Sequence, residues 1–522
     1  MKKPFENNKI NSVKRAAMII FVAVFAFWGL SSLILPSFIK HKINEGNFGN
    51  YQFEIEKVRV NLPGSRIVLD SFHAKSNIDG MDVLVPKLKI TGVKIIRLLL
   101  KRSFVANAVY LHSPQVLLEH GNYSANGVRP YTSKQASAEF FVGNFVITNG
   151  NFEFINTNDT SRFSRIEIEF INLSLNRDEQ YVFKNFSFDH LSGNIEEWSV
   201  PLSNNLYTVV GCELEFGTSK NIQIGQLHLS TNYPKYEVGH KTGVETDWFD
   251  FDLQDIKISG FEMQKLLENR GFIANNVSLG KVKGFAFRDK RLPRGNKPDT
   301  KLPMQALDEL KLPLQIDSLS FENAYIKYEE HAVGADEAGT VFFSGLSAKA
   351  YQISNIRKLI LLPTTISVSG KLMGKAHMDA YFVIPNKKYP GEYEVKGKLE
   401  PTAFGIINPI VNENLAADIK SGYIHELNFD FHYNNDLSEG ALTIQYSDLK
   451  IDLLNRRNDS AKPVQSVFFN GLILKKDNLK NKKVYREGTI HFSRDKKKSL
   501  FNYWWKSLYS GIKSVAVPKP LL

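Results

Sequence analysis

The chain has 522 residues, of which 43% are hydrophobic and 12% are aromatic, and its formal net charge is +12. This composition excludes an intrinsically disordered chain, and the length exceeds what one compact core usually holds. The single cysteine, Cys212, excludes a disulfide within the chain. We therefore expect an ordered protein with more than one structural region.

The first element in chain order is an uncharged run of twenty residues from Ala16 to Leu35. As a helix it would be about 30 Å long, which matches the hydrocarbon core of a bilayer. The alternative is a cleaved signal peptide, but residues 36–39 make a poor cleavage site. We predict a transmembrane signal anchor over residues 16–38. Its anchoring side chains are predicted to be Ile19, Ile20, Phe21, Phe25, Phe27 and Trp28.

The charges around this run predict its orientation. Five basic residues and one acidic residue precede it, whereas only Lys40 and Lys42 follow it before Glu45. The positive-inside rule keeps residues 1–15 in the cytoplasm, so the chain from about residue 40 onward would be exported. The basic residues are dispersed, which fits either attraction to anionic lipid headgroups or a solvated basic face. We expect no nucleic-acid partner.

Beyond residue 50 the hydrophobic pattern has a period of two, which predicts strands with one apolar and one solvated face. The clearest runs are residues 51–62, 165–175, 427–433 and 442–454. In three of these runs the apolar phase slips, after Ile55, Phe170 and Tyr446. We expect a β-bulge or a bend at each slip.

Predicted helices are few and short. They cover residues 94–102, 263–271 and 402–419, and the last contains Pro409, where we expect it to break. The charged, proline-rich stretch 288–303 is the best candidate for a linker or loop.

A repeat joins two of these helices to the strands that follow them. TGVKIIRLLLKRSFVANAVYL (91–111) aligns without a gap with SGFEMQKLLENRGFIANNVSL (259–279), and nine of 21 positions are identical. A weaker echo relates residues 144–155 to 318–329, around Asn149 and Asn323. One unit of strand, short helix and further strands therefore occurs twice, which indicates a stack of repeated units.

Several stretches resemble the AsmA-like family of Gram-negative envelope proteins, which includes TamB-type members. The uncharged run leads into FEIEKVRVNLPGSRIVLDSFHAKS (53–76), and a proline-initiated strand, a short leucine helix and a second proline-initiated strand follow in the family's order. The matching positions are Pro86, Leu88, Ile90, Leu98 to Leu100, Pro114, Val116, Leu118 and Glu119. Residues 440–454 and 488–513 resemble the ending of Bacteroidetes-type members.

The resemblance implies a mainly β fold. In this family an N-terminal transmembrane helix precedes an elongated, curved antiparallel β-sheet groove built from repeated units with a few short helices. Such a groove is expected to carry phospholipid between the inner and outer membranes, with the bulk of the chain in the periplasm. The predicted groove-lining residues are Phe53, Ile55, Val58, Val60, Ile166, Ile168, Phe170, Leu427, Phe429, Phe431, Leu442 and Ile444.

The C-terminus predicts a basic and aromatic amphipathic helix within residues 494–522. Its apolar stripe contains Phe501, Trp504, Trp505, Leu508 and Ile512, with Val515 one turn further on. Tryptophan beside lysine over an apolar face fits docking on a membrane or a partner. The alternative is a helix that caps the open end of the groove, and the two are compatible if the helix moves.

No enzyme motif is present: the sequence lacks a P-loop, a dinucleotide glycine fingerprint, G-x-S-x-G and H-E-x-x-H. His425 and His432, seven residues apart on one strand, would face opposite sides, so we expect no shared metal and no cofactor. The expected partners are phospholipid, the inner membrane and, beyond these, the outer membrane or envelope proteins. A second hypothesis is a non-enzymatic assembly or structural factor that binds outer-membrane proteins, by strand addition at an open edge.

The expected layout divides the chain into six parts. They are a cytoplasmic tail (1–15), the anchor (16–38), a first groove region with the repeats (40–287), a linker or loop (288–303), a second groove region (304–493) and the C-terminal helix and tail (494–522).

Overall fold

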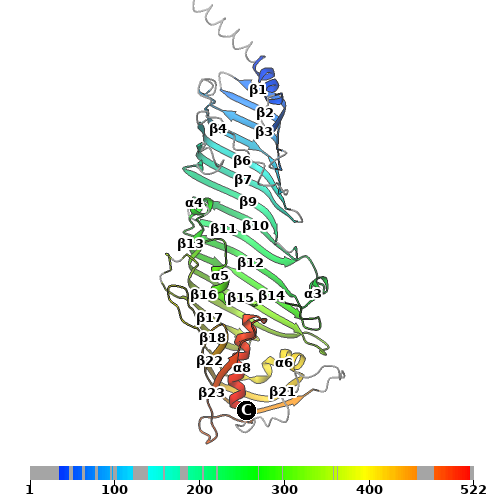
Figure 1. Ribbon diagram of the computed structural model, residues 1–522, viewed down its shortest axis with the longest axis vertical. Helices are drawn as coiled ribbons and strands as arrows, with labels where there is room; N and C mark the ends of the chain where they lie inside the picture. The colour runs from blue at the N-terminus through cyan, green and yellow to red at the C-terminus, as the bar shows by residue number, and fades with distance from the viewer. Residues whose placement is uncertain are drawn as a thin grey trace, which may run out of the picture. The chain divides into compact units, whose positions relative to one another are not determined.

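The fold is mainly β, with 61% strand, 14% helix and one large mixed sheet (Figure 1). The computed structural model describes residues 34–45, 51–61, 65–76, 80–94, 97, 103–120, 139–156, 159–176, 186–202, 205–218, 221–268, 270–296, 298–356, 358–360, 362–454 and 475–517. The predicted mainly β class is confirmed. The six predicted anchor residues lie outside these ranges, and within them no helix has the length and apolar character needed to cross a bilayer.

The chain forms two compact units. Unit 1 contains Met1–Ser203 with Glu213–Thr218, and unit 2 contains Asn204–Cys212 with Ser219–Leu522.

Unit 1 begins, within its described part, with a helix over residues 34–44, which we call the N-terminal helix. The strands that follow are β1 (Tyr51–Asn61), β2 (Arg66–Ser76), β3 (Met81–Thr91), β4 (Phe104–His112), β5 (Gln115–His120), β6 (Glu139–Asn156), β7 (Asp159–Asn176), β8 (Phe186–Ser187) and β9 (His190–Pro201). The residues of β10 (Tyr207–Gly217) are divided between the two units.

Unit 2 continues with β11 (Asn221–Thr231), α3 (Glu237–Thr242), β12 (Asp247–Ser259), α4 (Met263–Leu267), β13 (Phe272–Leu279), β14 (Lys281–Asp289), α5 (Pro303–Asp308), β15 (Leu314–His331), β16 (Gly339–Ser354), β17 (Thr364–Leu372), β18 (Ala376–Ile384) and β19 (Tyr393–Leu399). Its last elements are β20 (Thr402–Ala403), the 3₁₀ helix η2 (Phe404–Ile407), α6 (Asn408–Leu415), β21 (Ala417–Tyr433), β22 (Leu437–Leu453), β23 (Gly488–Ser493) and α8 (Leu500–Ala516).

The sheet is mixed, which corrects the predicted antiparallel sheet. In unit 1, β4 and β5 each pair antiparallel with β3 and parallel with the long strand β6. In unit 2, β13 and β14 each pair antiparallel with β12 and parallel with the long strand β15. Parallel neighbours need a long crossover, and in unit 2 residues 290–313, with α5, provide it.

The predicted repeat is therefore a repeat of structure. β4 and β13 hold its most similar residues, and each lies in the same place among its neighbours. Gly92 and Gly260 both have φ of +65°, and a Cβ on either would lie 2.2 or 2.4 Å from Cγ of Asn107 or Asn275. The glycine and the strand asparagine are thus close neighbours in both copies, whereas most of the helix predicted over residues 94–102 lies outside the described residues.

Two predicted phase slips coincide with residues in the left-handed backbone conformation, Asn172 (φ 55°) and Asp448 (φ 56°). At the slip after Ile55, the left-handed residue is Ser71 (φ 52°) on the partner strand β2. A left-handed residue turns the strand so that its apolar side chains return to the same face. The helix predicted over residues 402–419 divides at Pro409: the 3₁₀ helix η2 ends at Ile407, and α6 begins at Asn408 with Pro409 in its first turn, where the proline costs no hydrogen bond.

Candidate functional site

Two neighbouring rows of apolar side chains cross unit 2 on one face of its strands. Strand register places the first row on Leu319, Ala350, Ile366, Phe382, Val395 and Phe431. The second row consists of Phe321, Ala348, Val368, Ala380, Gly397, Phe429 and Leu442. Members of the two rows are two residues apart on each strand that carries both, so they share a face. We call these thirteen residues the apolar rows.

The apolar rows are covered at one end and partly open at the other. Phe431 and Leu442, on β21 and β22, are each only 1% exposed. Leu319 and Ile366, on β15 and β17, are only half-buried. The cover at the β22 end is α8, which packs against β22 and β23 (Figure 1). The sheet therefore presents apolar surface that the chain's own side chains do not fully bury.

The stripe of α8 that faces the sheet is made largely of small and polar residues. Tyr503, Ser507, Gly511 and Val515 follow one another at intervals of four and are buried. The Ser507 hydroxyl lies 2.6 Å from that of Ser438 on β22. Of these four residues only Val515 belongs to the stripe predicted from the sequence, because hydrophobicity alone does not mark the others, although the regular spacing of small residues is a visible signal.

The five predicted docking residues of α8 divide between cover and surface. Trp504, Leu508 and Ile512 pack against the apolar cluster, and the Trp504 ring lies 5.0 Å from that of Phe382. Phe501 and Trp505 are 49% and 40% exposed. The structure thus places part of the predicted stripe over the sheet, as the capping alternative expects, and part of it at the surface.

The crossover of residues 290–313 joins α8 in covering this end of the apolar face. Leu302 and Met304 are buried in the same apolar cluster as Phe431 and Leu442. Further polar contacts tie the crossover to the segment that precedes α8. They are Thr300 N–H to the Lys496 carbonyl at 2.7 Å, Arg294 to Asp495 at 3.0 Å and Lys497 to Asp299 at 3.0 Å. The predicted linker or loop, 288–303, forms the end of β14 and the first part of this crossover.

In unit 2 the other predicted groove residues lie close to the covered end. Phe429 and Leu427 pack at the margin of the buried cluster, and Ile444 is 0% exposed within it. In unit 1, Ile55 and Val58 are buried with Leu69, and the half-buried Val60 packs against them. Four more predicted residues, Phe53, Ile166, Ile168 and Phe170, are half-buried on their strands.

The opposite face of the same strands is polar. Lys349, Ser367, Tyr381, Lys396 and Asp430 alternate with the apolar rows and stand opposite one another across β16–β21. A shallow hollow of about 520 Å³ lies among the first four of these side chains. The sheet in unit 2 is therefore clearly two-sided, as the period-two pattern predicts.

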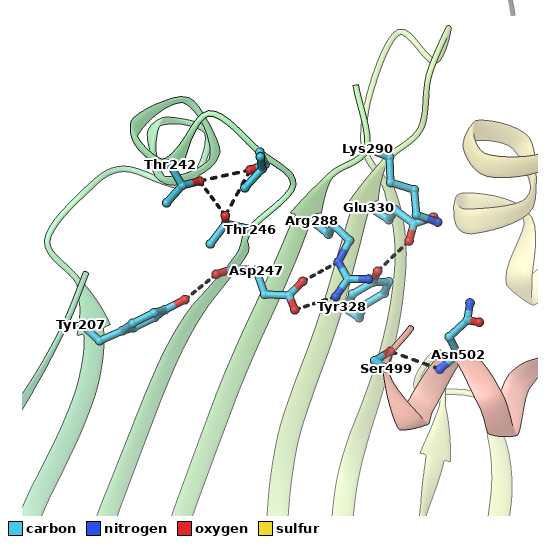
Figure 2. A network of polar contacts seen from close by, with 11 residues as sticks. Tyr207, Thr242, Thr246, Asp247, Arg288, Lys290, Tyr328, Glu330, Ser499 and Asn502 are labelled. Atoms are coloured by element: carbon cyan, nitrogen blue, oxygen red, sulfur yellow. Dashed lines mark hydrogen bonds and ion pairs between the residues drawn. The ribbon is translucent and has the colours of Figure 1, made fainter. Parts of the chain in front are cut away.

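A polar network lies where β12, β14 and β15 approach the start of α8, as Figure 2 shows. Arg288 donates two hydrogen bonds to the Asp247 carboxylate, at 2.5 and 2.6 Å, and Tyr207 donates to the Asp247 carbonyl. Glu330 accepts from Tyr328 at 2.7 Å and from Lys290 at 2.6 Å. These contacts join the strand ends to the first residue of the crossover.

The hydrogen bonds of this network hold the ends of these strands together. Burial and the nearby Glu330 carboxylate raise the pKa of Tyr328, and burial with the charge of Asp247 raises the pKa of Tyr207 to about 12. Both hydroxyls therefore stay protonated and donate at neutral pH. The ring of Tyr328 lies 6.1 Å from that of Phe501, so the network also borders α8.

The described part of the chain contains no group of three or more His, Cys, Asp or Glu side chains placed to hold a metal ion. His425 contacts Ser447 and His432 contacts Glu392, so the two histidines have different partners. Compared with known proteins, the sequence matches no family model and no curated protein.

Proposed function

We propose that the chain is an inner-membrane-anchored periplasmic protein that carries phospholipid between the inner and outer membranes, with the acyl chains on the open part of its apolar rows. The observation that supports this proposal is that the larger side chains of the rows on β15 and β17, Leu319 and Ile366, are half-buried, whereas Leu442 is 1% exposed. The smaller Ala348 and Ala350 on β16, between these strands, are buried. The membrane anchor and the compartment rest on the uncharged run and on the resemblance to the AsmA-like family. The elongated groove of that family is part of the same proposal.

The size of the open part suits a hydrocarbon chain. From β15 to β17 the rows cross two strand spacings, about 10 Å, which accommodates about two thirds of one acyl chain, because an acyl chain in a bilayer spans about half of the ~30 Å hydrocarbon core. Each methylene moved from water onto this face is stabilised by about 0.8 kcal/mol. A lipid could therefore lie on the rows with its headgroup in water.

The alternative of an assembly factor that adds strands at an open edge has less support. The outer edges of β1 and β23 make hydrogen bonds to helices: the Ile55 amide donates to Asn44 of the N-terminal helix, and the amides of Thr489 and His491 donate to two serines of α8. A partner strand that paired at these residues would have to displace the helix contacts.

The test uses two neighbouring residues of β17 that face opposite sides. Full-length protein in donor vesicles is assayed for transfer of fluorescent phospholipid to acceptor vesicles. Ile366→Glu places a carboxylate on the apolar rows, where its desolvation exceeds about 1.4 kcal/mol, so transfer should fall at least tenfold. Ser367→Glu, on the polar face, should change transfer less than twofold. Equal effects of both variants, with unchanged circular dichroism, would refute the proposal.

A further inference from the structure

Three loops of unit 2 lie at the same end of its strands and expose large apolar side chains. They connect α5 to β15 (residues 309–313), β16 to β17 (355–363) and β18 to β19 (385–392). The antiparallel pairing of successive strands from β15 to β19 brings all three loops to one end of these strands. Four leucines and a tyrosine in the loops, each 36% to 60% exposed, form what we call the leucine rim: Leu310, Leu312, Leu359, Leu362 and Tyr389.

Hydrogen bonds hold the three loops beside one another. The Asn355 side chain in the second loop donates to a backbone carbonyl of the first loop at 3.1 Å. From the third loop, the Asn386 side chain donates to the Leu362 carbonyl at 3.1 Å, and Lys388 donates to the Ile360 carbonyl at 2.8 Å. Ile360 itself is only 3% exposed, so it fixes the second loop against the protein. The leucine rim is therefore one continuous surface whose apolar side chains are held toward solvent.

Positive charge accompanies these apolar side chains. Each loop places a lysine next to a residue of the leucine rim, in LKL at 310–312, KL at 358–359 and KY at 388–389. Lys311 and Lys358 are exposed. The loops contain two acidic residues, Glu309 and Glu392, against five basic residues, Lys311, Arg357, Lys358, Lys387 and Lys388. The surface is thus apolar and basic at once.

We propose that the leucine rim is a contact surface for a lipid bilayer that contains anionic lipid. Apolar side chains on such a surface enter the boundary between headgroups and acyl chains, where tyrosine is also enriched. Neighbouring lysines extend their charged ends to the phosphates, and anionic headgroups complement the excess positive charge. Lysine is depleted at interfaces between proteins, which favours a lipid surface over a protein partner here.

The leucine rim also borders the open part of the apolar rows. Ile366 is the third residue of β17, and β17 begins directly after the loop of residues 355–363. A bilayer bound at the rim would therefore lie next to the rows, and a lipid would have a short route between the two. That route rests on the proposed function, whereas the membrane contact itself does not.

The test places an NBD fluorophore on the leucine rim of the full-length protein in vesicles. Leu362→Cys is labelled in a Cys212→Ser background, because Cys212 is the single native thiol. The vesicles are phosphatidylcholine with or without phosphatidylglycerol, and nitroxide-labelled acyl chains quench a probe that enters the bilayer. We expect the fluorescence at residue 362 to fall at least twofold in the anionic vesicles only. Leu453→Cys, at a residue 59% exposed against 60% for Leu362, is the matched control and should not be quenched.

Two pairs of charge reversals separate a contact at the rim from general attraction. Lys311→Glu with Lys358→Glu should abolish quenching at residue 362, because the new carboxylates repel anionic headgroups. Lys371→Glu with Lys375→Glu makes the same change in net charge at the opposite ends of β17 and β18, and should leave the quenching intact. All four lysines are exposed, so we expect circular dichroism to be unchanged in both variants.

Three outcomes would overturn the proposal. They are no quenching at residue 362 in anionic vesicles, equal quenching at residues 362 and 453, and equal loss of quenching in the two charge-reversed variants. If the rim instead contacts a second copy of the chain, residue 362 will stay unquenched, and Leu362→Ser will remove self-association in sedimentation velocity. Failure of lipid transfer along the apolar rows would leave the quenching as predicted, so the two proposals can fail separately.

Discussion

Leu442 and Leu319 belong to the same apolar face but differ in cover, so the same substitution should have different costs at the two sites. Leu442 is 1% exposed beneath α8, and Leu319 is half-buried on β15. Truncating Leu442 to alanine removes three apolar carbon groups from a filled site. At about 0.8 kcal/mol each they account for about 2.4 kcal/mol, and the cavity term raises the expected loss to about 3–4 kcal/mol.

At Leu319 the side chain already contacts solvent, so only part of the transfer term and little of the cavity term apply. We expect Leu319→Ala to cost about 1.5–2 kcal/mol. Urea denaturation followed by circular dichroism measures both variants against the parent protein, with the midpoint compared at constant slope. A loss at Leu319 equal to that at Leu442 would mean that the β15 end is covered in solution, which would refute the open apolar face.

Three further predictions concern the supporting structure, and urea denaturation measures each of them. Asp247→Ala should lower the free energy of unfolding by about 2 kcal/mol, because it leaves the Arg288 guanidinium without its carboxylate and the Arg288 side chain is only 15% exposed. Adding Arg288→Met should recover part of this loss. A double variant whose loss equals the sum of the two single losses would contradict the prediction. A hydrogen bond from the arginine two residues on holds the pKa of Asp289 below its ordinary value, so this carboxylate stabilises the fold above about pH 4 and the contribution is lost as pH falls through the folded-state pKa. Asp289→Asn should flatten that pH dependence, and an unchanged slope would argue against the contact. Gly92→Ala and Gly260→Ala should each cost about 1–3 kcal/mol, because both glycines have φ of +65° and closely contact an asparagine; a cost at only one would mean that the repeats are not equivalent.

Local features of the fold could be predicted because they depend on neighbouring residues. The alternation in residues 427–433 predicts a strand, and β21 contains it. The phase slips after Phe170 and Tyr446 predict bends, and left-handed residues lie there. The repeat could be found because residues 91–111 and 259–279 have similar sequences.

The parallel pairs could not be predicted, because a strand's pattern does not reveal which distant strand lies beside it. The crossover of residues 290–313 has the composition of a linker, yet its Leu302 and Met304 are buried against distant strands. The contact of Leu302 and Met304 with these strands forms only when the complete chain has folded.

The period-two pattern predicts strands with one apolar face, but it does not predict which part of that face is covered. Phe431 and Ile444 have the pattern of groove-lining residues, but the structure buries them beneath α8, which lies far along the chain. The open part of the rows, around Leu319 and Ile366, could not be predicted, because the strands there have the same alternation of apolar and polar residues as the covered strands. The buried stripe of α8 depends on close approach to β23 at Gly511, which favours small residues over large apolar ones.

The most direct test of lipid binding on the apolar rows is photo-crosslinking in cells at two pairs of adjacent residues. A photoreactive amino acid at Leu319 or Ile366 would face the apolar side, and one at Ser320 or Ser367 would face the polar side. Our account predicts phospholipid adducts, detected by mass spectrometry, at the first two positions and none at the other two. Adducts at all four positions alike, or at none of them while the protein is folded and expressed, would contradict it.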